Sequence, residues 1–244
     1  MEVSSEAEAR VVELMARPSA RVVVEVIRRY FRATVENVER IPRSGGALIV
    51  GNHALFGIDS FVLVPLLLKE TGRYVRFIAD RNVWQREPFA SFFQLVAAVP
   101  GEHEVAGRLL TSGQLLGVYP GGIHDSFKTS RERGRLQWGN RSGFARLAMR
   151  AGVPIIPVAG LGIDDAWRVL GRERWIGRTL FGSERYDIPI PVGVWGTPLP
   201  RRARFRFVVA PPVDTRGNPD DPVDVERVRA GAQQALEQIL DGRA

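Results

Sequence analysis

The chain has 244 residues, 45% of them hydrophobic and 25% charged, a composition typical of one globular unit and not of a disordered segment. It contains no cysteine, which excludes disulfides, thiolate metal sites and cysteine nucleophiles. The histidines are His53, His103 and His124, far apart and without companions at metal-ligand spacing, so we expect no metal centre.

The formal net charge is +7, and arginine supplies almost all of the positive charge, since lysine occurs only at Lys69 and Lys128. Arginine binds phosphate groups bidentately, so its excess points to anionic partners. The charge alone does not distinguish nucleic acid from anionic lipid or a phosphorylated substrate. The base composition of the genome would explain the arginine content equally well.

The ends and apolar runs of the chain predict where the protein resides. Residues 1–6 are acidic in character and no apolar run follows them, so we expect no signal peptide. The longest stretch without a charged residue is 109–124, and polar residues and glycines interrupt it. A membrane-spanning helix needs about 20 predominantly apolar residues. We therefore expect a cytoplasmic protein that is either soluble or peripherally associated with a membrane.

The first elements are predicted from apolar residues at helical spacing over residues 5–34, with a break at Pro18. Arginines occupy much of the surface that this stripe leaves, which makes the segment basic and amphipathic. A stripe of this kind either packs on the core or rests on a membrane, and the pattern fits both. We assign residues 1–29 to an N-terminal amphipathic helical segment and residues 30–244 to one domain.

The rest of the chain alternates between predicted strands and helices. Short apolar runs predict strands at 47–50, 75–79, 116–119, 155–159 and 205–209. Helical spacing predicts helices at about 60–69, 88–99, 104–112, 142–151 and 222–240. Because several strands are uniformly apolar, we expect an α/β fold: a single domain with a largely parallel central sheet flanked by helices.

A histidine and an acid follow the first of these strands. His53 stands at the carboxyl end of the strand, where open α/β sheets place their ligands, and Asp59 comes six residues later. Gly57 permits a turn that would bring the carboxylate onto the imidazole. Such a carboxylate fixes the ring tautomer and leaves the other nitrogen as a general base. Alternatively, Asp59 only caps the next helix and His53 is an ordinary loop histidine.

A glycine pair follows the strand at 116–119. Gly121 and Gly122 come directly after Tyr119 and Pro120. Glycine lets backbone N–H groups approach a ligand closely, so the pair could donate to an oxyanion or a phosphate. An ordinary tight turn is the alternative. Nucleophile-elbow, Walker A and dinucleotide-binding glycine motifs are absent from the sequence.

Together with the apolar strand at 153–158, these two segments resemble the motifs of the glycerolipid (lysophospholipid) acyltransferase family. Asn52, His53 and Asp59 match its Asn-His-acid motif. The five residues between histidine and acid are similar to the branch that includes diacylglycerol and phytyl-ester acyltransferases. The similarity extends over about residues 30–215, so it identifies 30–244 as an acyltransferase domain.

The glycine-pair motif departs from the usual pattern of that family. The family usually has Phe-Pro-Glu-Gly-Thr-Arg, whereas this sequence has Gly121 in place of the glutamate. The variant branch has Pro-Gly-Gly followed by an acid, which Asp125 matches. Because the usual motif helps to bind glycerol phosphate, the resemblance leaves the identity of the acceptor open.

The resemblance implies transfer of a fatty acyl chain from acyl-CoA or acyl-carrier protein to a glycerolipid hydroxyl, with no cofactor. His53 would remove the acceptor proton, Asp59 would orient the ring, and N–H groups near Gly121 and Gly122 would bind the oxyanion. The implied acceptor is a lysophospholipid such as 1-acylglycerol-3-phosphate. Diacylglycerol or a long-chain alcohol is an alternative acceptor.

Further residues are predicted to contact the substrates. Those that accompany the two motifs are Asn52, Tyr119, Pro120, Gly121 and Gly122. The candidates for binding an acceptor phosphate are Arg81, Arg135 and Arg141. An alternative of another class is a catalytically inactive, lipid-binding protein that docks on membranes, in which the imidazole would not contact a carboxylate.

Residues 167–181 interleave arginines with tryptophan and leucine. Such a mixture suits an anionic membrane surface, although a solvated loop would also accommodate it. No fold signature for nucleic-acid binding accompanies it, so we expect no nucleic-acid partner.

Overall fold

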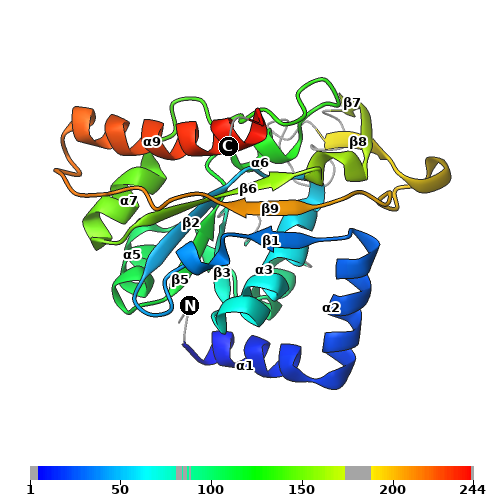
Figure 1. The fold of residues 1–244 in the computed structure, drawn as a ribbon, viewed down its shortest axis with the longest axis horizontal. Coiled ribbons are helices and arrows are strands. Elements are labelled where there is room, and N and C mark those ends of the chain that lie inside the picture. The colour runs from blue at the N-terminus through cyan, green and yellow to red at the C-terminus, as the bar shows by residue number, and fades with distance from the viewer. Residues whose placement is uncertain (1–4, 81–83, 85–86, 88, 174–187, 243–244) are drawn as a thin grey trace.

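The computed structural model describes residues 5–80, 84, 87, 89–173 and 188–242, which form an α/β fold (Figure 1). The described α-helices are α1 (Ser5–Ala16), α2 (Pro18–Tyr30), α3 (Ile58–Thr71), α4 (Phe89–Leu95), α5 (His103–Thr111), α6 (Gly122–Ser126), α7 (Gly143–Ala151) and α9 (Pro222–Leu240). The strands are β1 (Thr34–Glu36), β2 (Ala47–Gly51), β3 (Val75–Ala79), β4 (Val99–Pro100), β5 (Leu115–Val118), β6 (Ile155–Leu161), β7 (Arg168–Glu173), β8 (Ile188–Val192) and β9 (Arg206–Val209). Short 3-10 turns are η1 (Val38–Arg40), η2 (Leu55–Gly57), η4 (Ile163–Ala166) and η5 (Val194–Gly196).

The described strands form a seven-stranded sheet in the order β1-β9-β6-β2-β5-β3-β4 and a separate antiparallel pair, β7-β8. All neighbours in the large sheet are parallel except β6 and β9. The predicted α/β fold with a largely parallel central sheet is therefore confirmed. Its central strand β2 pairs with β5 and β6, so the carboxyl ends of these three strands meet at one edge.

Helices cover both faces of the sheet. Along β2, Ala47 and Ile49 pack in the cluster that includes α3, whereas Leu48 and Val50 pack against α5, α7 and α9. Every residue of β2 is buried, which explains its uniformly apolar sequence. Figure 1 shows α9 on one side of the sheet and α1 and α2 on the other.

Two predicted helices are wrong at their carboxyl ends. The helix predicted over 5–34 ends at Tyr30, because Arg32 has a left-handed φ of 45°, and the following residues form β1, which pairs with β9. The helix predicted over 88–99 ends at Leu95, and a left-handed Ala97 (φ 49°) leads into β4. Strands of two and three residues are too short to give a recognisable apolar pattern.

The two N-terminal helices differ in how their apolar residues are placed. Val11 of α1 is buried in the core, whereas α2 has no buried residue. Val22, Val23 and Val26 of α2 are exposed. Among the residues that the structure describes, no helix combines the length and the apolar character needed to cross a bilayer.

Candidate active site

His53 lies just beyond β2, in a loop whose backbone folds back on itself. Phe56 and Gly57 both adopt left-handed conformations, with φ of 56° and 70°, and this double turn leads directly into α3. Asp59 in the first turn of α3 therefore faces the imidazole. His53 Nδ1 lies 3.1 Å from each carboxylate oxygen of Asp59.

Asp59 does not cap α3. The helix begins at Ile58 with Gly57 as the preceding cap residue, so the predicted capping position is wrong. The Asp59 carboxylate is 1% exposed and accepts the N–H of Ala54 at 3.0 Å in addition to the contact with His53. The carboxylate therefore binds the histidine loop and does not accept the free N–H groups at the start of its own helix.

The His53 ring is held between Asp59 and a stack of aromatic rings. It stacks on Tyr119 at a centroid distance of 4.0 Å, and Tyr119 stacks on Phe77 at 4.7 Å. The Tyr119 hydroxyl lies 3.0 Å from Ser60 Oγ. Burial and the nearby Asp59 carboxylate hold the pKa of Tyr119 well above its usual value, so the phenol stays protonated.

This arrangement leaves one ring nitrogen for substrate. With Nδ1 directed at Asp59, Nε2 is the nitrogen that an incoming hydroxyl can reach, and the side chain of His53 is 19% exposed. A neutral imidazole that donates from Nδ1 to a carboxylate has an acceptor lone pair at Nε2. The geometry is that of a carboxylate-oriented general base.

The residues predicted to surround His53 lie at the same sheet edge, but not all of them point to substrate. Both ends of the Asn52 amide bind Gly160, with Nδ2 donating to its carbonyl at 2.9 Å and Oδ1 accepting its N–H at 2.7 Å. Asn52 thus links β2 to β6.

In the glycine-pair turn, Pro120 and Gly121 are buried, and the N–H of Gly122 donates to the carbonyl of Tyr119 at 2.8 Å. That N–H is engaged inside the turn, which argues against its predicted role with an oxyanion.

Two of the three arginines predicted to bind phosphate, Arg135 and Arg141, lie among the described residues. Arg81 lies outside the described residues, and Arg135 is exposed. Arg141 is also exposed, and its guanidinium donates to the carbonyls of Gln137 and Trp138 at 3.3 Å.

Asp125 of α6 is a site residue that the sequence did not assign. Its carboxylate is fully buried and accepts the backbone N–H of His53 at 2.7 Å and that of Gln137 at 3.1 Å. Lys128 Nζ lies 3.2 Å from Asp125 and 3.4 Å from Asp164. The acid after Pro-Gly-Gly was the available sequence signal for Asp125, whereas none pointed to Lys128 or Asp164.

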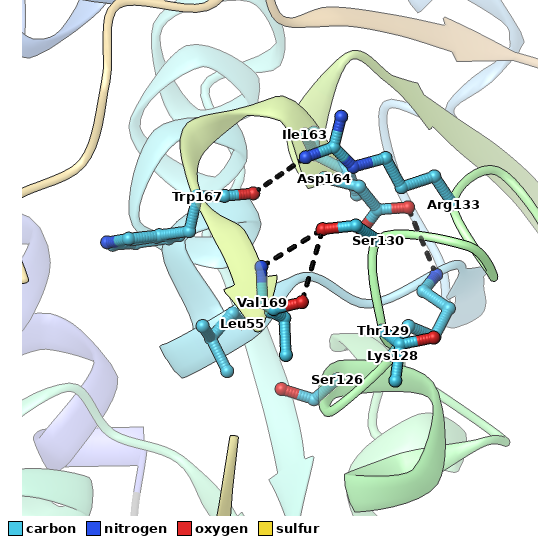
Figure 2. Close-up of a pocket in the computed structure, with 10 residues that line it drawn as sticks. All are labelled: Leu55, Ser126, Lys128, Thr129, Ser130, Arg133, Ile163, Asp164, Trp167 and Val169. Carbon is cyan, nitrogen blue, oxygen red and sulfur yellow. Dashed lines mark hydrogen bonds and ion pairs between the residues drawn. The ribbon is translucent and has the colours of Figure 1, made fainter. Parts of the chain in front are cut away.

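Lys128 and Asp164 line a small pocket beside the histidine loop, together with Ser130 and Arg133 (Figure 2). Burial lowers the pKa of Lys128, but the carboxylates of Asp164 and Asp125 outweigh this effect and raise it above its usual value. Burial raises the pKa of Asp164. Ser130 forms hydrogen bonds with backbone atoms of β7, and Arg133 donates to the backbone carbonyl of the residue just before β7, as Figure 2 shows.

Gly121 gives a direct test of this packing. A Cβ at position 121 would lie 2.3 Å from Asp125 Cβ and 3.0 Å from the carbonyl oxygen of Gln137. We expect Gly121→Ala to lower the free energy of unfolding by about 1–3 kcal/mol, the usual effect of overpacking. Gly171→Ala is the control, because a Cβ there would meet no atom within 4 Å. Urea unfolding that shows equal stability for the two variants would contradict the contact between Gly121 and Asp125.

Comparison with known proteins identifies the family of the chain. A model of the family described as "Acyltransferase" matches residues 32–160, more than half of the chain. The "DGAT1/2-independent enzyme synthesizing storage lipids" of Bos taurus is 31% identical over 208 residues, which cover 85% of this chain and 58% of that protein. The human protein of the same name is also 31% identical, with 85% and 60% covered. An uncharacterised Mycobacterium tuberculosis protein is 32% identical over 231 residues, with 88% and 63% covered.

The chain spans about three fifths of the length of these relatives. In fold it is similar to the crystal structure of the 1-acyl-sn-glycerophosphate acyltransferase PlsC from Thermotoga maritima. The TM-score is 0.56 at 18% identity, with 97% of this chain and 86% of that chain covered. The matched residues contain both motifs at the sheet edge, and the resemblance noted in the sequence is confirmed: the chain belongs to the acyltransferase family.

Proposed function

We propose that this protein is an O-acyltransferase that moves a fatty acyl chain from an acyl thioester to a hydroxyl of a glycerolipid. The contact of His53 Nδ1 with Asp59 at 3.1 Å is the observation that carries the proposal. In an inactive lipid-binding protein, the alternative, the imidazole would not contact a carboxylate. Family membership supplies the reaction class, and the contact supplies a base suited to it.

In the proposed mechanism, His53 Nε2 takes the proton of the acceptor hydroxyl as its oxygen attacks the thioester carbonyl. The Asp59 carboxylate stabilises the imidazolium that forms. Collapse of the tetrahedral intermediate breaks the carbon–sulfur bond, and the imidazolium returns its proton to the leaving thiolate. The donor is acyl-CoA or acyl-carrier protein, and the reaction needs neither a cofactor nor a covalent enzyme intermediate.

We propose an uncharged acceptor, a diacylglycerol or a long-chain alcohol. The carboxylates of Asp59 and Asp125 accept N–H groups of the histidine loop, and the cation of Lys128 lies between Asp125 and a third carboxylate, that of Asp164. A phosphate group placed there would be repelled by carboxylates in a region of low dielectric. The relatives named for synthesis of storage lipids favour the same class of acceptor.

A lysophospholipid such as 1-acylglycerol-3-phosphate is the second candidate, favoured by the fold shared with a 1-acyl-sn-glycerophosphate acyltransferase. The test is incubation of the purified protein with labelled acyl-CoA or acyl-carrier protein and, in separate mixed micelles, each acceptor. We expect diacylglycerol or fatty alcohol to be labelled faster than lysophosphatidate or glycerol phosphate. Labelling of lysophosphatidate alone would overturn the uncharged acceptor, and no labelled lipid in any mixture would overturn acyl transfer.

We also propose peripheral attachment to the cytoplasmic surface of an anionic membrane. Trp195 and Leu199 are 96% and 65% exposed, in the loop that follows β8. A hydrogen bond of 2.7 Å from the Tyr30 hydroxyl to the carbonyl of Pro200 connects this loop to α2 with its exposed valines. Tryptophan favours the interface of a bilayer, and arginines of α2 complement anionic head groups. Of the arginine-rich segment 167–181, only residues up to 173 are described.

Membrane attachment is tested by flotation with vesicles of neutral or anionic lipid. We expect binding to increase with the anionic fraction and to weaken in high salt. A Trp195→Ser, Leu199→Ser double variant should lose about tenfold or more in binding, because it removes two large apolar side chains. Val223→Ser, which changes an exposed residue of α9 on the side of the sheet opposite α2, is the control. Equal flotation of the double variant and the control would contradict this membrane-facing loop.

A further inference from the structure

We propose that Asp125 is a positioning residue: its hydrogen bond to the backbone of His53 holds the imidazole in register with Asp59, and Lys128 and Asp164 hold Asp125. This inference rests on the proposed function, because it assigns a role in the same reaction. Asp125 touches neither the imidazole ring nor the proposed acceptor in this role, and it acts only through the loop of His53.

The first observation is how Asp125 binds the loop. Oδ2 accepts the N–H of His53 at 2.7 Å, a charge-assisted bond between groups that are 72 residues apart in the chain. Oδ1 accepts the N–H of Gln137 at 3.1 Å. The carboxylate is completely buried, so water does not compete for either bond. A single side chain thus ties α6 and the segment at Gln137 to the loop after β2.

The second observation is that Asp125 itself is held. Lys128 Nζ, with its side chain only 2% exposed, lies 3.2 Å from Asp125 and 3.4 Å from Asp164. Asp164 also accepts the N–H of Gly134 at 3.0 Å. A buried charge is tolerated only when it is paired, so none of these three groups can turn away without leaving another unpaired. Figure 2 shows Lys128 and Asp164 directed at one another.

The third observation is that the same loop is bound from its other side. The N–H of Ala54 donates to Asp59 at 3.0 Å, and the carbonyl of Ala54 accepts the hydroxyl of Ser126 at 2.9 Å. Asp59 comes from α3, whereas Ser126 and Asp125 come from α6. The peptide groups on both sides of His53 are therefore fixed before any substrate arrives.

The absence of a side chain at Gly121 fits the same role. A Cβ there would overlap Asp125, at 2.3 Å from its Cβ. Glycine at this position allows the carboxylate to approach the loop. A displacement of a catalytic group by about 1 Å can lower a rate about 10²-fold, so the fixed loop is expected to matter for turnover.

The test compares Asp125→Ala, which removes the acceptor of the His53 N–H, with Asp125→Asn, which keeps an acceptor oxygen of the same shape. Thr215→Val is the matched control, because it removes a different buried hydrogen bond, from Thr215 Oγ1 to the carbonyl of Val153 at 2.8 Å. Each folded variant is assayed well below its melting temperature for kcat and KM. Nuclear magnetic resonance then records the shifts of the His53 amide proton and of the ring nitrogen Nδ1.

We expect Asp125→Ala to lower kcat by about 10²-fold with KM changed less than about threefold, and Asp125→Asn to lose less. The His53 amide proton should move upfield in Asp125→Ala, and the Nδ1 signal should change. Thr215→Val should melt at a lower temperature with kcat unchanged. If Asp125→Ala does not fold, the proposal predicts a shifted amide signal and a reduced kcat in Asp125→Asn.

Wild-type kcat in a folded Asp125→Ala, or an unshifted His53 amide in both Asp125 variants, would overturn the positioning role. Failure of the proposed function looks different, since the wild-type protein would then transfer no acyl group to any acceptor. In that case the shifts of the amide and of Nδ1 still decide whether Asp125 sets the geometry of the His53–Asp59 pair.

Discussion

Replacing His53 with alanine should reduce acyl transfer by about 10²–10⁴-fold or more, because general-base catalysis accounts for that much and the proposed base would also position the acceptor. The fold should persist. The lost stacking on Tyr119 contributes about 1 kcal/mol, which corresponds to a fall of roughly 2–4 °C in melting temperature. Turnover with labelled acyl-CoA and a thermal melt measure the two effects.

His103→Ala is the matched control for this experiment. His103 is an exposed histidine at the start of α5, outside the proposed site, so its removal should leave turnover unchanged. Full activity of His53→Ala would refute the mechanism. Loss of folding in His53→Ala, with His103→Ala intact, would instead show that the loop histidine is structural.

Replacing Asp59 with asparagine should lower kcat by about 10²–10⁴-fold while KM changes little. The amide oxygen can still accept the N–H of Ala54, so the loop keeps its shape. The amide nitrogen would then donate to Nδ1 of His53, which places the ring proton on Nε2 and removes the acceptor lone pair needed by a base. The amide also cannot stabilise an imidazolium.

Asp220→Asn serves as the control for Asp59→Asn. Asp220 has a side chain that is 72% exposed and forms a surface ion pair with Arg150 at 2.6 Å. Such pairs contribute little to stability, so both melting and turnover should remain at wild-type values. Wild-type kcat in Asp59→Asn would show that the carboxylate charge has no part in the chemistry.

The fold was predictable because its main elements carry strong local patterns. The strands β2, β5 and β6 are buried on both faces and read as apolar runs, and α9 was predicted with its observed bounds. The sheet edges were less predictable. β1 and β4 have three and two residues, and their pairing with β9 and β3 depends on partners distant in the chain.

The His53–Asp59 contact was predictable for a local reason. Only five residues lie between His53 and Asp59, and Gly57 supplies the left-handed turn that folds one side chain back onto the other. The prediction that Asp59 caps α3 was wrong because the helix starts at Ile58, two residues earlier than its sequence suggests.

The α/β class, the acyltransferase motifs and the histidine–acid pair were predictable from the chain alone, since these depend on apolar periodicity and short-range spacing. The residues that surround the pair are known only from the folded protein. Asp125 reaches the His53 N–H across 72 residues, and Asn52 reaches Gly160 across 108. Such contacts arise because parallel strands bring their carboxyl ends to one edge of the sheet, and no local pattern in the chain records which side chains meet there.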